Sequence, residues 1–156
     1  MPEHPQDGRL SSGSSVSHDD PASVLGQMMR AIPAGPDHND RAVLREAIEA
    51  TQHAALAAVA CADACLGEEM VEELVGCIRT LLDTADVCEA TARVLSRNAG
   101  PGRVLARILL AACAAACRAG REVCEEFLPI HDHCRICARA CRQAERACRA
   151  LLGSLP

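Results

Sequence analysis

The amino-acid sequence predicts an all-α protein, an antiparallel up-down-up-down four-helix bundle with a cysteine-lined core. Three observations support this prediction. The chain of 156 residues contains one Phe and no Tyr or Trp, and it lacks the β-branched and aromatic runs that favour strands. Four long stretches of helix-favouring residues are separated by short breaks. Eleven cysteines recur along these stretches at helical spacing.

Residues 1–40 differ in composition from residues 41–153, which form the predicted bundle domain. They are rich in Pro, Gly, Ser and Asp, which predicts a disordered N-terminal tail with one short turn of helix around Val24 to Ala31. They contain neither the apolar stretch of a secretory signal peptide nor a twin-arginine pair. We therefore expect a cytoplasmic protein, in which thiols stay reduced.

The first two predicted helices span residues 41–66 and 69–97. Asn39 or Asp40 is the expected N-cap of the first helix, and Gly67 ends it. The second helix opens with acidic residues, which suit the positive end of a helix dipole.

The last two predicted helices span residues 103–127 and 132–152. The third follows a strong helix breaker, Asn-Ala-Gly-Pro-Gly at 98–102, and ends before Pro129. Asp132 is the expected N-cap of the fourth. Because the connections are short, consecutive helices are expected to be antiparallel neighbours.

The cysteines of each predicted helix point to one side at 100° per residue. On the last helix the four thiols fall within about 60° of one another, and its arginines lie roughly 130° away. We therefore expect the thiols to face the interior and the arginines to face solvent. The thiols expected in the core are Cys61, Cys65, Cys77, Cys88, Cys113, Cys117, Cys124, Cys134, Cys137, Cys141 and Cys148.

The number and phase of these thiols favour a metal-binding core. A single buried cysteine is usually a small apolar residue, but so many in phase on four helices are not explained that way. Thiols four residues apart on one helix are poorly placed for a disulfide. Soft thiolates select Cu(I), and one Cu⁺ per thiolate leaves the core neutral, whereas Zn²⁺ with four thiolates leaves two negative charges. The sequence therefore predicts several Cu(I) ions per chain.

One end of the predicted bundle carries more thiols than the other. Four thiols lie deeper, namely Cys88, Cys113, Cys117 and Cys148. The other seven lie within about 15 Å of the end where the first two helices meet. His131, His133 and Met70 lie at the same end. The two histidines are interpreted as a site that receives copper, with a solvated loop as the alternative. His53 is expected at the surface.

Three segments resemble the cytosolic branch of the cysteine-rich four-helix-bundle copper-storage proteins. They are DTADVCEATARVLSR, AACAAACRAGREVCEEF and HCRICARACRQAERACRALL. The resemblance implies a homotetramer that stores Cu(I) without catalytic turnover, with the eleven cysteines as ligands and His131 and His133 at the mouth of the bundle. A copper chaperone would be a partner.

The sequence departs from this family pattern at five positions on the inward-facing stripes. Relatives commonly carry further cysteines there, so a lower copper capacity is expected. The five residues are Ala54, Ala58, Thr84, Gly120 and Ala144.

Other classes of protein remain as alternatives. A thiol redox enzyme would use Cys134 and Cys137, spaced as C-x-x-C, and an iron–sulfur or zinc-binding helical protein would use four cysteines. A copper-responsive regulator would bind DNA through arginines of the last helix. The net charge of −5 argues against general nucleic-acid binding, and no stretch is apolar enough for a membrane span. The arginines in question are Arg135, Arg139, Arg142, Arg146 and Arg149.

Overall fold

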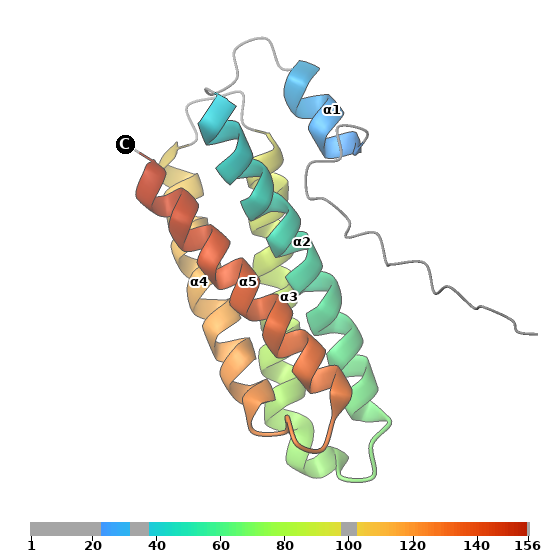
Figure 1. Cartoon of the computed structure of the whole chain (residues 1–156). Helices are drawn as coiled ribbons and strands as arrows, with labels where there is room; N and C mark the ends of the chain where they lie inside the picture. Colours follow the sequence, from blue (N-terminus) through green and yellow to red (C-terminus); the bar gives the residue numbers. More distant parts are fainter. Residues whose placement is uncertain (1–22, 32–37, 98–102, 156) are drawn as a thin grey trace, which may run out of the picture.

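The computed structural model describes residues 23–31, 38–97 and 103–155 (Figure 1). Their regular secondary structure is entirely helical, which confirms the all-α class. No helix among these residues has the length and apolar character to span a membrane. The helices are α1 (Val24–Ala31), α2 (His38–Leu66), α3 (Val71–Ser96), α4 (Arg103–Glu125) and α5 (Asp132–Ser154).

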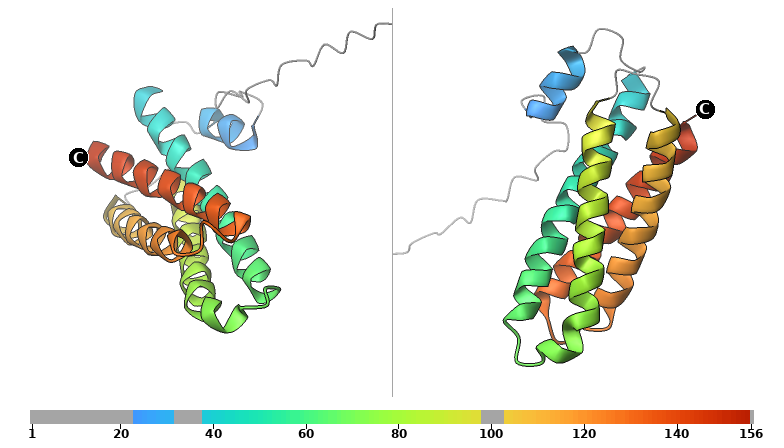
Figure 2. Two further views of the ribbon diagram at one scale, coloured as in Figure 1. Left: turned by 60° about the horizontal axis from the view of Figure 1, so that its bottom comes forward. Right: turned by 180° about the vertical axis from the view of Figure 1, so that it is seen from behind.

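The four long helices, α2 to α5, pack side by side, and successive helices run in opposite directions (Figures 1 and 2). Helix α2 contacts α3 and α5 extensively, and α4 likewise contacts α3 and α5, whereas α2 and α4 lie diagonally across the core. The connections 67–70 and 126–131 lie together at one end of the bundle. This end is called the mouth below.

Some helix boundaries differ from the prediction. Helix α2 begins at His38, so Asn39 and Asp40 lie inside it and do not cap it. Residue His131, with extended backbone angles, is the N-cap of α5, and no side chain caps that helix; Asp132 is its first residue. The predicted breaker at 98–102 lies outside the described residues.

Helix α1 lies in the N-terminal segment at the position where a short turn of helix was predicted, which confirms that prediction. The hydroxyl oxygen of Ser23 accepts a hydrogen bond from the Gly26 amide at 3.1 Å, which caps the helix. Leu25 and Met29, four residues apart on one face, pack against the core of the bundle. The rest of the expected tail, residues 1–22 and 32–37, lies outside the described residues.

The core is divided between thiols and aliphatic side chains. All eleven cysteines are buried and none is more than 3% exposed, which confirms that they face inward. The five predicted outward arginines of α5 are exposed, as is His53. Aliphatic side chains close the end opposite the mouth. They are Leu44, Ile48, Leu95, Leu110 and Leu151.

A layer near the middle of the core contains small residues from several helices. The Thr84 hydroxyl donates to the Thr80 carbonyl at 2.7 Å and to the Ala116 carbonyl of α4 at 3.1 Å. A Cβ added at Gly120 would lie 2.9 Å from Thr84 Oγ1 and 3.4 Å from Cys141 Sγ. Thr84 therefore fills the space that the absence of a side chain at Gly120 leaves.

This contact predicts that the effect of Gly120→Ala on stability reverses when Thr84 is replaced by Ala. In the wild type the methyl group crowds Thr84, and overpacking costs about 1–3 kcal/mol, more than the gain of about 1 kcal/mol in helix propensity. We expect Gly120→Ala to destabilise the metal-free protein, and to stabilise it in the Thr84→Ala background, where the crowding is gone. Urea unfolding of the four proteins under reducing conditions measures the coupling. Strictly additive free energies would contradict the contact.

Candidate metal centre

Six thiols lie together just inside the mouth and are called the mouth cluster. They come from all four long helices, because each helix turns its cysteine-bearing face toward the common axis. Three groups of ligand atoms lie within 4.8 Å of one another: Cys61, Cys65 and Cys134 with His133; Cys61, Cys124 and Cys137; and Cys77, Cys124 and Cys134. Since the groups share members, the cluster is continuous and could hold several ions.

The thiols of the mouth cluster differ in acidity. Hydrogen bonds from Cys124 and Cys137 hold the pKa of Cys61 well below its usual range, and the nearby His133 acts in the same direction. Burial, together with the charge on Cys61, raises the pKa of Cys65 to about 12. Of these two thiols, Cys61 therefore loses its proton the more readily.

Three side chains at the mouth form a second group of possible ligands. The Glu68 carboxylate lies 3.2 Å from His131 Nδ1 and 3.2 Å from His133 Nε2. The two imidazole rings are stacked, with centroids 5.0 Å apart. The second ring nitrogen of His133, Nδ1, lies 3.3 Å from the Cys61 sulfur. His133 therefore links the carboxylate at the mouth to the thiols inside.

The three mouth residues differ in exposure. Glu68 is 34% exposed, His133 22% and His131 7%. Burial would lower the pKa of His133, but contacts with Cys61 and Glu68 outweigh it and raise the pKa. Met70, expected at this end, is half-buried and packs against the core.

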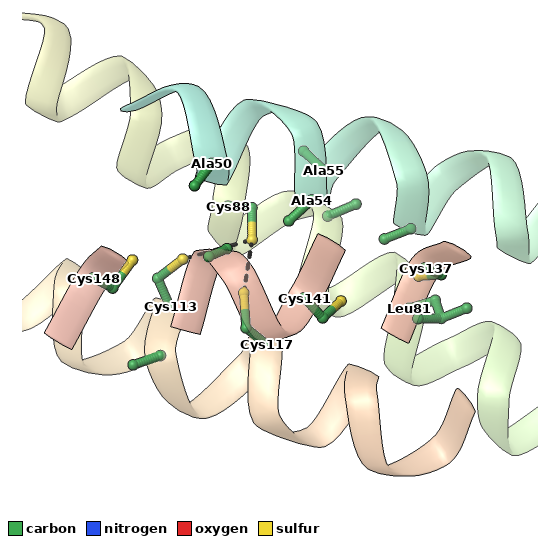
Figure 3. Close-up of a cluster of buried hydrophobic side chains, with 14 of the residues drawn as sticks. Ala50, Ala54, Ala55, Leu81, Cys88, Cys113, Cys117, Cys137, Cys141 and Cys148 are labelled. Carbon is green, nitrogen blue, oxygen red and sulfur yellow. Dashed lines mark hydrogen bonds between the residues drawn. The ribbon is translucent and has the colours of Figure 1, made fainter. Parts of the chain in front are cut away.

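A separate group of thiols, called the deep triad, lies beyond the middle layer. It consists of Cys88 from α3 and Cys113 and Cys117 from α4, and all three are fully buried. The Cys88 sulfur lies 3.5 Å from that of Cys113 and 3.4 Å from that of Cys117 (Figure 3). Hydrogen bonds from Cys117 and from Cys148 of α5 lower the pKa of Cys113. The triad provides one three-thiolate site.

Cys141 was grouped with the thiols near the mouth, and the structure corrects this placement. Figure 3 shows its side chain beside Cys117, nearer to the deep triad than Cys137 is. Hydrogen bonds from Cys117 and Cys137 lower the pKa of Cys141 to about 4. Cys141 therefore lies between the two thiol groups and belongs to neither.

The expected site residues are thus brought together, with one addition. Glu68 was missed, because an acidic residue in a short connection is usually only solvated. Its proximity to the two histidines depends on the 67–70 and 126–131 connections lying side by side, which no spacing along the chain reveals.

The fold and the site define a class: an all-helical metal-binding protein whose buried, thiol-lined core suits several soft ions. The chain belongs to the copper storage protein family. The model of this family, Csp, matches residues 40–153.

Solved structures and a curated relative agree with this assignment. The copper storage protein Ccsp from Streptomyces lividans, loaded with 10 copper equivalents, is 45% identical, with a TM-score of 0.81, over 84% of this chain and 99% of that chain. A cytosolic copper storage protein from Streptomyces lividans with five coppers is 47% identical, with a TM-score of 0.75, over 77% of this chain and 100% of that chain. The uncharacterized cysteine-rich protein YhjQ from Bacillus subtilis is 31% identical over 91 residues, which are 58% of this chain and 79% of that protein.

Proposed function

We propose that this protein stores Cu(I) in the cytoplasm by binding several ions to the cysteine thiolates of its core, without catalytic turnover. The observation that carries the proposal is the arrangement of eleven free, buried thiols in one compartment, many of them within 4.8 Å of two others. Two or three thiolates at such distances suit Cu(I), which soft sulfur ligands select.

The proposed ligands include every thiol of the chain, with the mouth histidines as the site that first receives copper. Each Cu⁺ that replaces a thiol proton leaves the charge of the core unchanged, which avoids the cost of burying uncompensated charge. His131 and His133 accept the ion, and Cys61 then receives it from His133, whose Nδ1 lies 3.3 Å from the sulfur. The thiol ligands are Cys61, Cys65, Cys77, Cys88, Cys113, Cys117, Cys124, Cys134, Cys137, Cys141 and Cys148.

Zinc at the mouth is a second candidate, supported by one observation. Cys61, Cys65, Cys134 and His133 provide three sulfurs and one nitrogen within 4.8 Å, the ligand set of many structural zinc sites. The deep triad has only three ligands and does not match that set.

An anaerobic titration of the reduced protein separates the two functions. We expect several Cu(I) ions per chain to be taken from a bicinchoninate complex, and Zn²⁺ in a parallel titration to occupy about one site, because one four-ligand group suits it. Binding of only one or two Cu(I) ions per chain, or displacement of bound Cu(I) by Zn²⁺, would contradict storage of copper.

The redox and regulator alternatives receive less support. Cys134 and Cys137 are fully buried, whereas a reactive thiol has to be reached by its substrate. Three arginines of the α5 stripe form ion pairs: Arg135 with Asp132, and Arg142 with Glu125 and Arg149 with Glu145, the last two at 2.7 Å. A DNA-shift assay with and without copper tests the regulator directly; copper-dependent binding to DNA would favour it.

Assembly and delivery are part of the proposal. Leu56 and Val59 leave 71% and 47% of their surface exposed on α2, which would suit the contact between subunits of a homotetramer. Leu66, Ile130 and Ile136 are exposed near the mouth, where a copper chaperone would dock to deliver its ion.

The group of Glu68, His131 and His133 at the mouth predicts a pH dependence of copper uptake. His133 binds an ion only when its ring is neutral, so the uptake rate should rise as the pH increases through its pKa, which contacts with Cys61 and Glu68 raise. Glu68→Gln removes one cause of the raised pKa and should move the midpoint to lower pH. Stopped-flow uptake between pH 5 and 9 measures both, with Glu69→Gln as the control. An unchanged midpoint in Glu68→Gln would contradict the role of this contact.

A further inference from the structure

The thiols of the core are interrupted between the mouth cluster and the deep triad. At this level the buried positions include Ala54, Leu81, Thr84 and Gly120, none of which offers sulfur. None of the ligand groups found among the described residues contains members of both the mouth cluster and the deep triad. An ion bound at the mouth therefore has to cross a layer that is poor in ligands.

The spacing of thiols along three of the helices makes this crossing long. On α3 the cysteine after Cys77 is Cys88, eleven residues or about 16 Å away. On α4 Cys117 and Cys124 are seven residues, or about 10 Å, apart. Helix α2 has no cysteine on the deep side of Cys61. These distances exceed the few ångströms over which one ion can contact two sulfurs.

Helix α5 is the exception. Cys137 of the mouth cluster and Cys141 are four residues apart, which is about 6 Å along the axis and on the same face. Cys141 in turn lies beside Cys117 of the deep triad (Figure 3). Its sulfur is 3.4 Å from the position that a Cβ would take at Gly120, and Gly120 is three residues along α4 from Cys117. One side chain thus divides the long gap into two short steps.

We propose that Cys141 is the relay through which Cu(I) passes from the mouth cluster to the deep triad, a role that rests on the proposed storage function. The ion moves by ligand exchange: the bond to Cys141 forms before the bond to Cys137 breaks, and the bond to Cys117 follows. Copper remains Cu⁺ throughout. The proton that leaves the receiving thiol is taken up by the thiolate that is released, so charge is conserved at each step.

The relay is tested by the time course of loading in Cys141→Ser, with Cys148→Ser as the matched control. Both variants lose one buried thiol beside the deep triad, but Cys148 lies on the side away from the mouth. In Cys141→Ser the first ions should bind at the wild-type rate, and the later phase should slow at least about tenfold, or about 1.4 kcal/mol in the barrier. Cys148→Ser should lose capacity without this delay.

A second variant separates the loss of the relay from the mere loss of one thiol ligand. A Cβ added at Gly120 would lie 2.9 Å from Thr84 Oγ1 and 3.4 Å from the Cys141 sulfur. A sulfur at position 84 would therefore lie in the same layer as that of Cys141. Thr84→Cys in the Cys141→Ser background should restore most of the lost rate. Circular dichroism checks helicity, and Cys141→Ala replaces Cys141→Ser if the latter does not fold.

Two measurements locate the ions and distinguish a failure of the relay from a failure of copper storage. Stopped-flow absorbance of the copper–thiolate bands gives the rates, and anomalous scattering from crystals frozen at partial loading should show the deep triad empty in Cys141→Ser and filled in the wild type. Equal late-phase rates in Cys141→Ser and the wild type, or filling of the deep triad on the same time scale, would overturn the relay. A wild type that binds no more than one or two ions would instead overturn copper storage itself.

Discussion

Replacing Cys124 with Ser should remove about two Cu(I) ions from the capacity of the protein, since this residue belongs to two of the three-thiol groups of the mouth cluster. It is fully buried on α4, and its sulfur lies within 4.8 Å of those of Cys61 and Cys137 and of those of Cys77 and Cys134. A hydroxyl group at this position leaves each group with two sulfurs, and a harder oxygen replaces a soft ligand. The remaining pairs should bind their ions more weakly than the intact groups.

Cys148→Ser is the appropriate control for this experiment. Cys148 is equally buried, but it belongs to none of the ligand groups found among the described residues. Its replacement should therefore cost less copper than that of Cys124. Native mass spectrometry after anaerobic loading counts the ions, and chelator competition ranks their affinities. Equal losses in the two variants would mean that the mouth cluster does not hold its ions in the overlapping groups described above.

Loading with Cu(I) should raise the melting temperature by more than about 20 °C. A ligand present at a thousandfold excess over its dissociation constant adds about 4 kcal/mol per site when only the folded state binds it. Each kcal/mol corresponds to about 4–8 °C for a domain of this size class. Several sites therefore have a large combined effect. The metal-free core is a weak starting point, because thiols and alanines occupy positions that larger apolar side chains fill in other bundles.

The far end of the core provides a variant that separates stability from copper binding. Leu110 is fully buried in the aliphatic end opposite the mouth. Leu110→Ala should destabilise the metal-free protein by about 2–5 kcal/mol while leaving the number of bound ions unchanged. Scanning calorimetry before and after loading, under anaerobic conditions, measures both effects. A rise in melting temperature of only a few degrees on full loading would show that the ions bind the unfolded chain nearly as well as the core.

The helices and the orientation of the thiols could be predicted because they depend on local periodicity. Helix formers, the glycine at position 67 and the regular spacing of the cysteines are properties of short segments. Helix ends were less predictable: Asp132 looked like an N-cap, but the backbone enters α5 in an extended conformation at His131. Helix α1 forms in a segment of turn-favouring composition because Leu25 and Met29 find a surface to pack against.

By itself, the sequence determined that this chain forms long helices with their thiols on one face, and the number of thiols favoured soft-metal chemistry. These conclusions depend on residue type and spacing alone. Only the tertiary structure decided how the thiols are grouped. The grouping into a mouth cluster, a deep triad and Cys141 between them depends on the relative heights of neighbouring helices. The approach of Glu68 to His131 and His133 depends on two connections meeting, because contacts between distant segments are set by helix packing and leave no local pattern.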